Sequence, residues 1–206
     1  MNNKGSAGIT AIPLLSSFLL VGATVSSVMF EGSDNMAKDA EQIVNDIMDE
    51  ITTYLKIDDV IGKYYNTDGC RRIEKIVILV KQLIPNNINM SEMKIKISNN
   101  NDVILLDYSR QAVESNSEAL FEHQVWETTN NTFSLIVTRD KDRSLLEHNI
   151  MNEDATFIAI KLTNRFAMEK DESITVSIIP AKGIVRSVVL ETPSFHSSNI
   201  LSFSEV

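Results

Sequence analysis

Four acidic side chains that follow one apolar segment have the residue type that binds calcium. They are Asp140, Asp142, Glu153 and Asp154. Carboxylate oxygens are preferred ligands of Ca²⁺, but these positions do not have the spacing of an EF-hand loop. We therefore expect a solvated acidic loop here rather than a calcium site, and we assign neither a metal ligand nor a cofactor.

The other reactive side chains form no catalytic pattern. Glu147 and His148 could exchange protons, but no activated nucleophile and no third, orienting group is recognisable beside them. Cys70 is the single cysteine, so it cannot form a disulfide within the chain. The sequence also has no Gly-rich phosphate loop. We expect no enzymatic activity and no small-molecule substrate.

Two short motifs predict a covalent modification. Asn89-Met90-Ser91 and Asn130-Asn131-Thr132 are N-x-Ser/Thr sequons, which are acceptors for N-linked glycans in exported proteins. Both sequons fall in polar segments between apolar runs. Asn89 and Asn130 are therefore candidate glycosylation sites.

The composition limits the classes of partner. The chain has 206 residues, of which 28 are acidic and 19 are basic, giving a formal net charge of −9. Nucleic-acid binding requires clustered Lys and Arg, so this balance disfavours it. A hydrophobic fraction of 43% can support one core of ordinary size.

The N-terminal region contains an uncharged apolar stretch from Ile9 to Phe30. As a helix it would be roughly 33 Å long, enough to cross a bilayer core of about 30 Å. The stretch is too long for the apolar region of a secretory signal, and its positive and small residues, Lys4 and Gly5, precede it. The sequence therefore predicts a membrane-inserted helix that is retained on the mature protein.

Small side chains recur along this stretch. Gly22 and Ser26 are four residues apart, as are Ala23 and Ser27, so each pair lies on one helix face. Such spacing allows two helix backbones to approach closely. The helix is thus predicted to pack against other helices, through Ser16, Gly22, Ala23, Ser26 and Ser27.

A second helical pattern follows Gly32. Apolar residues recur every three or four positions from Met36 to Leu55, with acidic residues between them, which is typical of an amphipathic helix. We expect one N-terminal helix over residues 6–60, apolar over 9–30 and amphipathic over 34–56.

The remainder of the chain, residues 70–206, has a period of two and short turns. We expect a first strand buried on both faces over 76–84, a hairpin from 93–97 and 103–108, and further strands over 133–138, 156–162, 174–179 and 184–190. Residues 110–131 read as a long loop with Trp126 beneath it. The fold class is α+β: a long hydrophobic helix, then an all-β antiparallel sandwich or barrel, Ig-like in organisation.

Three features together resemble the archaellins, the filament subunits of the archaeal swimming organelle, which are built like type IV pilins. Lys4-Gly5-Ser6-Ala7-Gly8-Ile9 resembles the family's processing site. The apolar helix runs directly into a β domain. The segment Glu172 to Phe195 resembles the family's C-terminal hairpin. The resemblance extends over essentially the whole chain.

The resemblance implies how the precursor is processed. A prepilin-type peptidase would cleave between Gly5 and Ser6, removing a leader of residues 1–5, with Gly8 at the third mature position. Before cleavage, Lys4 would stay on the cytoplasmic side of the membrane.

The function implied is that of a structural subunit, which polymerises through its N-terminal helix into the archaellum, an extracellular filament for swimming. Its partners would be identical subunits, the peptidase and, before assembly, the membrane. Two alternatives remain: an adhesion pilin or minor pilin-like component of the same machine, and a monomeric membrane-anchored extracellular binding domain.

Overall fold

The computed structural model describes residues 38–45, 47, 54–67, 69–115, 120–127 and 131–203. The chain divides into two units, residues 1–48 and 49–206. In the first unit, residues 38–45 and 47 are α-helical and exposed. The apolar stretch 9–30 and its small residues lie outside the described residues. Within the described part of the chain, no helix is long and apolar enough to cross a membrane.

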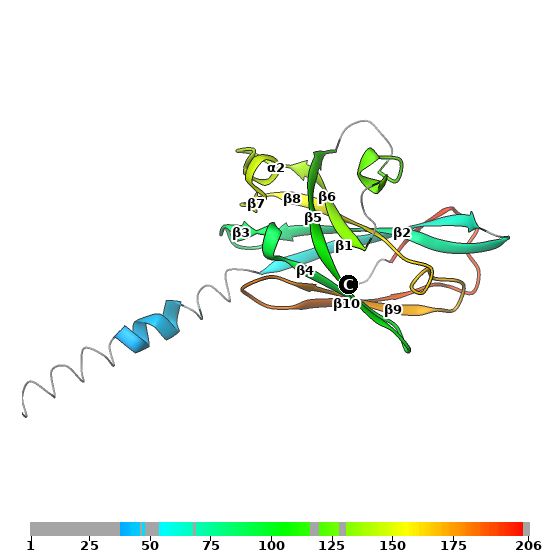
Figure 1. Ribbon diagram of the computed structural model, residues 1–206, viewed down its shortest axis with the longest axis horizontal. Coiled ribbons are helices and arrows are strands. Elements are labelled where there is room, and N and C mark those ends of the chain that lie inside the picture. Colours follow the sequence, from blue (N-terminus) through cyan, green and yellow to red (C-terminus); the bar gives the residue numbers. More distant parts are fainter. Residues whose placement is uncertain are drawn as a thin grey trace, which may run out of the picture. The chain divides into compact units, whose positions relative to one another are not determined.

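The second unit consists mainly of β-strands (Figure 1). The strands are β1 (Leu55–Thr67), β2 (Cys70–Gln82), β3 (Ile88–Asn89), β4 (Lys94–Ser98), β5 (Val103–Glu114), β6 (Thr132–Arg139), β7 (Ile150–Met151), β8 (Ala155–Lys161), β9 (Ser173–Ile179), β10 (Arg186–Glu191) and β11 (Ile200–Ser202). Three short helices interrupt them: η1 (Met90–Glu92), η2 (Gln124–Glu127) and α2 (Ser144–His148).

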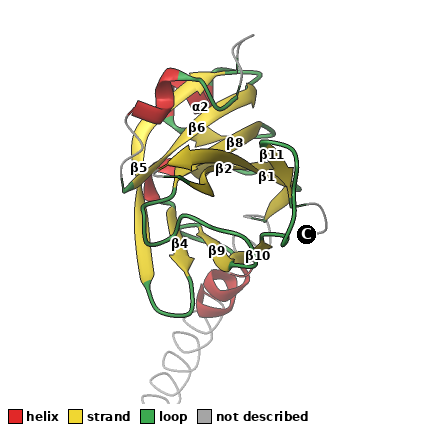
Figure 2. Ribbon diagram, turned by 90° about the vertical axis from the view of Figure 1, so that its right-hand side faces the viewer, coloured by secondary structure: helices red, strands yellow, loops and turns green. Residues whose placement is uncertain are grey.

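Nine strands form one continuous sheet in the order β10-β9-β4-β5-β6-β8-β2-β1-β11, and β3 pairs separately with β7. The sheet doubles back on itself at β5 (Figure 2). The first half of β5 pairs with β4 and the second half pairs with β6. One strand therefore belongs to both layers of a sandwich.

The change of layer occurs at a local irregularity in β5. The β5–β6 register shifts between Tyr108 and Ala112, and Arg110 between them has φ 60°. Next to this point the Ser109 and Ser134 hydroxyl oxygens lie 2.6 Å apart, which ties β5 to β6. A bulge of this kind bends a strand and increases its twist. It explains how β5 turns from one layer into the other.

The main core lies between the two layers. Inward-facing residues from each layer alternate with outward ones, as a half-buried strand requires. Phe133 is fully buried at the centre, and its ring lies 5.3 Å from that of Tyr108. The Tyr108 hydroxyl donates to Asn149 Oδ1 at 2.9 Å, and burial raises its pKa. The core thereby also anchors the residue that ends α2.

A second, smaller core covers the outer face of the β2–β6–β8 layer. Phe121, Val125 and Trp126 pack on Val77, Ile136 and Ala159. The Trp126 indole donates to Leu120 O at 3.0 Å, and the Lys75 ammonium lies 4.9 Å from the Trp126 ring. The prediction that Trp126 lies beneath a loop is confirmed, although β5 extends to Glu114, so the loop begins later than expected. β2 is buried on both faces from Ile76 to Ile78, as expected, but it spans Cys70–Gln82 rather than 76–84, and Leu83 and Ile84 are exposed beyond its end.

The N-terminal boundary of the sheet was predicted wrongly. We expected the helix to extend to residue 60 and the β domain to begin at residue 70. Instead, the first strand, β1, begins at Leu55, so residues 55–60 are part of the sheet. Leu55, Ile57 and Val60 face the core in β1. Leu55 also fits the helical repeat that precedes it, and a short apolar run does not distinguish the two periods.

The expectation of a purely antiparallel sandwich is also wrong at one place. β5 and β6 are parallel, and all other pairs in the sheet are antiparallel. A parallel pair requires a long crossover connection, and residues 115–131 supply it. The predicted hairpins β4–β5 and β9–β10 are confirmed.

We expect a fragment beginning at Glu31 to fold as a β-rich monomer, because the second unit has its own core. In this fragment Phe133→Ala should lower the free energy of unfolding by about 3–5 kcal/mol, through lost burial and a cavity. Val103→Ala is the control, because Val103 is 66% exposed and should change stability by less than about 0.5 kcal/mol. Urea denaturation measures both, and equal effects would contradict this placement of the core.

Candidate functional site

The connection between β6 and β8 gathers three of the four acidic residues singled out in the sequence. Asp140 follows β6 directly, Asp142 precedes α2, and Asp154 lies immediately before β8. One carboxylate oxygen from each lies within 4.8 Å of those of the other two. Glu153 is exposed and instead pairs with Lys141 at 2.8 Å. The fold thus selects Asp140, Asp142 and Asp154 from the four.

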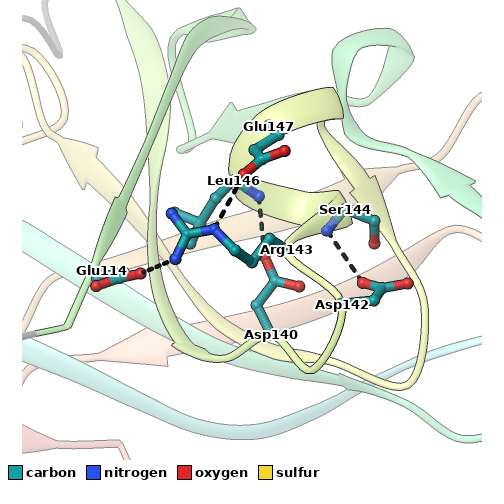
Figure 3. Close-up of polar contacts among 7 residues, drawn as sticks. All are labelled: Glu114, Asp140, Asp142, Arg143, Ser144, Leu146 and Glu147. Atoms are coloured by element: carbon teal, nitrogen blue, oxygen red, sulfur yellow. Dashed lines mark hydrogen bonds and ion pairs between the residues drawn. The ribbon is translucent and has the colours of Figure 1, made fainter.

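Each of the three carboxylates is oriented by a backbone N–H (Figure 3 shows the first two). Asp140 Oδ2 accepts from Leu146 N at 3.0 Å, and Asp142 Oδ1 accepts from Ser144 N at 3.0 Å. Asp154 Oδ2 accepts from Asn152 N at 2.9 Å. Ser144 makes a side-chain as well as a backbone hydrogen bond to Asp142, whereas Asp140 and Asp154 each keep one oxygen without a partner among the described residues.

The two carboxylate oxygens without a hydrogen bond are buried. Asp140 Oδ1 and Asp154 Oδ1 have no partner among the described residues. Asp154 is only 2% exposed. Burial raises the pKa of Asp154, and the charges of Asp140 and Asp142 add to this effect. Hydrogen bonds from Ser144 hold the pKa of Asp142 below its ordinary value. The expectation of a solvated loop is therefore wrong for Asp154. This residue directly precedes Ala155, the first residue of the buried strand β8.

A hard divalent cation fits this arrangement. Ca²⁺–oxygen distances are about 2.3–2.6 Å, so two ligands of one ion lie at most roughly 5 Å apart. The separation of the three carboxylates is within that limit. An ion held here would neutralise the buried charge and fasten the end of β6 to the start of β8.

Arg143 supports the loop from the opposite side. It has φ 62°, and its guanidinium reaches Glu147 at 3.0 Å and Glu114 on β5 at 3.2 Å (Figure 3). Glu147 is therefore engaged in an ion pair, and His148 is exposed at the end of α2. No sequence pattern predicts this link from α2 to β5.

Among the predicted glycosylation sites, Asn89 is described and Asn130 is not. Asn89 is exposed and caps η1: its Oδ1 accepts from Ser91 N at 3.0 Å, and its Nδ2 donates to Glu92 at 2.9 Å. The side chain is thus reachable from solvent in a compact turn. The predicted processing residues Lys4, Gly5, Ser6 and Gly8 lie outside the described residues, and Cys70 is exposed.

The acidic cluster gives a prediction with opposite signs in two conditions. Because burial raises the pKa of Asp154, its ionisation in the folded state costs stability, and this cost grows as pH rises from the ordinary carboxyl pKa through the raised one. At pH 7 with a chelator, Asp154→Asn should therefore raise the unfolding temperature. With Ca²⁺ in about 100-fold excess over its dissociation constant, the unsubstituted fragment should gain about 2.7 kcal/mol, and the variant should lose most of this gain.

Glu153→Gln is the matched control, because Glu153 lies next to the cluster without joining it. Its response to Ca²⁺ should equal that of the unsubstituted fragment. Thermal unfolding without any calcium-dependent shift would contradict the prediction that this cluster binds a cation.

The whole chain is similar to proteins of one family. The sequence profile of archaeal-type flagellin matches residues 5–190. Flagellin B3 of Methanocaldococcus jannaschii is 25% identical over 210 residues, which cover 98% of this chain and 96% of that protein.

Two solved structures have a similar fold. The crystal structure of archaeal flagellin FlaB1 from M. jannaschii superposes with a TM-score of 0.63 at 18% identity, covering 72% of this chain and 94% of that chain. The archaeal flagellum of Methanospirillum hungatei strain JF1 gives a TM-score of 0.63 at 15% identity, covering 94% of this chain and 98% of that chain. Because the profile spans most of the sequence, from Gly5 to Leu190, the chain belongs to the archaeal-type flagellin family.

Proposed function

We propose that this chain is a structural subunit of the archaellum, which polymerises through its N-terminal helix into the swimming filament. The observation that carries the proposal is the family match from residue 5 to residue 190, since it includes the apolar stretch together with the β domain. The similarity to the M. hungatei filament over 94% of the chain supports it at the level of fold.

The proposed assembly begins in the membrane. The apolar stretch 9–30 is inserted in the bilayer, with Lys4 held on the cytoplasmic side. A prepilin-type peptidase cleaves between Gly5 and Ser6, with Gly8 as part of the recognised segment. Cleavage removes the lysine, so the helix is free to leave the lipid.

The helix then enters a bundle of identical helices. Lipid and helix core are similarly apolar, so burial alone does not favour the transfer. Close backbone approach does favour it, and we assign this role to the small residues Ser16, Gly22, Ala23, Ser26 and Ser27. A contact between two different surfaces of identical subunits does not close on itself, and it generates a helical filament. The β domains coat the outside.

The proposed exported location also gives the two sequons a role. Asn89 is exposed, and together with Asn130 it is proposed to carry an N-linked glycan in the native filament. Glycans there would add a hydrated layer to the filament surface.

Gly5→Leu should abolish processing, because a bulky side chain replaces the small residue before the scissile bond. When the variant is made in an archaeal host, N-terminal sequencing should show that residues 1–5 are still present. The protein should be found only in the membrane fraction. Ser16→Ala is the control, since it lies beyond the proposed cleavage site and should leave cleavage unchanged. Mature Gly5→Leu protein beginning at Ser6 would refute the assigned site.

The glycan proposal has its own readout. The intact mass of subunits from native filaments should exceed the sequence mass of the mature chain, and Asn89→Gln should remove one glycan increment from it. Asn87→Gln is the control, because Asn87 lies two residues away and heads no sequon. An unchanged mass in Asn89→Gln would exclude this site.

A further inference from the structure

The sequon residue Asn89 forms part of the wall of a small surface hollow. The hollow has a volume of about 250 Å³, and it is lined by residues 86–89 and Glu92 on one side and by Ala181 and Lys182 on the other. The first group lies on the connection from β2 to β4, and the second lies in the turn between β9 and β10 (Figure 1). Two segments that are far apart in the sequence therefore meet at this hollow.

The wall that contains Asn89 is held in place by buried neighbours. Ile88 and Met90, on either side of Asn89, are both part of the main core. Asn89 itself pairs with Ile150 between β3 and β7, and Met90 N donates to Asn149 O at 2.9 Å. The Asn89 side chain is exposed between these two anchors. A group attached to it therefore starts from a fixed position.

The amide of Asn89 is oriented so that its nitrogen lies beside the hollow. Its Oδ1 accepts from Ser91 N, and its Nδ2 donates to Glu92 Oε1 at 2.9 Å. Nδ2 is the atom that carries the sugar in an N-linked glycan. Because Glu92 also lines the hollow, Nδ2 is held next to its wall. Nδ2 has two hydrogens, so a sugar can replace one while the other remains to be donated.

The lining of the hollow has the chemistry that a sugar requires. The Asn86 and Asn87 amides and the Lys182 ammonium supply donors, and the two amides and the Glu92 carboxylate supply acceptors. Sugar hydroxyls both donate and accept, so they can use both kinds of group. The aliphatic side chain of Ile88 also lines the hollow and can contact the C–H face of a sugar ring.

The size of the hollow suits a single sugar that is already attached. Pockets for free drug-sized ligands are about 300–1,000 Å³, and this hollow is smaller. A short flexible link gives the attached group an effective concentration of the order of millimolar. Contacts too weak to bind a free sugar can therefore hold one that is linked to Asn89.

We propose that the first sugar of a glycan on Asn89 lies in this hollow and contacts Lys182. The inference rests on the proposed function, which includes glycosylation of Asn89. The attached sugar joins the β2–β4 connection to the β9–β10 turn by hydrogen bonds. The glycan thus has a structural role in the subunit, in addition to forming a hydrated layer on the filament.

Hydrogen exchange in a matched pair of variants tests the proposal. Ser91→Ala destroys the sequon and Ser91→Thr keeps it, and Ser91 is exposed and does not line the hollow. Both full-length chains are produced in a glycosylating archaeal host that lacks its own filament subunit, and they are dispersed in detergent as single subunits. Backbone amides of residues 181–185 should exchange about 2- to 10-fold more slowly in Ser91→Thr, as expected for one net hydrogen bond.

Two further measurements make this readout specific. Exchange at Gly69, in the β1–β2 turn outside the hollow, should be equal in the two variants. Lys182→Ala, added to each variant, should remove most of the difference between them at residues 181–185, because the sugar loses its contact on that turn.

The outcomes separate this inference from the proposed function. An intact mass without a glycan on Asn89 of the Ser91→Thr chain would overturn the proposed glycosylation and this inference with it. A glycan on Asn89 with equal exchange at residues 181–185 would overturn this inference alone, since the sugar would then point into solvent. A difference that is equally large at Gly69, or that persists after Lys182→Ala, would also overturn it. Because single subunits are measured, a failure of filament assembly would count against the proposed function without changing this readout.

Discussion

An apolar stretch that must be kept from water is the constraint on which the rest of this protein depends. From Ile9 to Phe30 the sequence carries no charge, so the proposed life of the subunit has two environments for this stretch, the bilayer and a bundle of copies. A helix that is apolar all round is stable only when it is buried all round. The β domain has to remain folded both in the membrane-inserted subunit and in the filament. Its core must therefore contain no residues of that helix.

The second unit meets this requirement through the path of β5. Because β5 pairs with β4 at one end and with β6 at the other, a single strand links the two layers and closes the core around Phe133. The outer faces then differ in composition. One carries the packed segment with Trp126, and the other exposes Val103, Leu105 and Val189.

Much of this fold could be predicted from local patterns. Strict alternation identified the β4–β5 hairpin, and the uninterrupted apolar run identified β2 as a strand buried on both sides. The start of β1 was missed because Leu55 continues the three- and four-residue repeat of the preceding segment. The local pattern of apolar residues there fits a helix as well as a strand. The parallel pairing of β5 with β6 was missed because the relative direction of two strands is a tertiary property, which the local period does not report.

The acidic loop shows a similar limit. Sequence spacing excluded an EF-hand but gave no signal that Asp154 would be buried, since its burial follows from the packing of β8 against β2 and β6. Asp140 and Asp142 were named only as two of four acidic residues, and nothing in the local pattern predicted that each would accept a hydrogen bond from a backbone N–H a few residues ahead. The family resemblance was carried by residues at the two ends of the chain, where Lys4-Gly5 and the β9–β10 hairpin lie.

The central claim is that the apolar helix is retained after leader removal and buried by copies of itself. Filaments shed from cells that make this chain test it most directly, by electron cryo-microscopy together with N-terminal sequencing of the subunit. The account predicts a subunit that begins at Ser6, with residues 9–30 packed helix against helix along the filament axis and β domains outside. Protein that keeps residues 1–5 and occurs only as single copies in the membrane would contradict it.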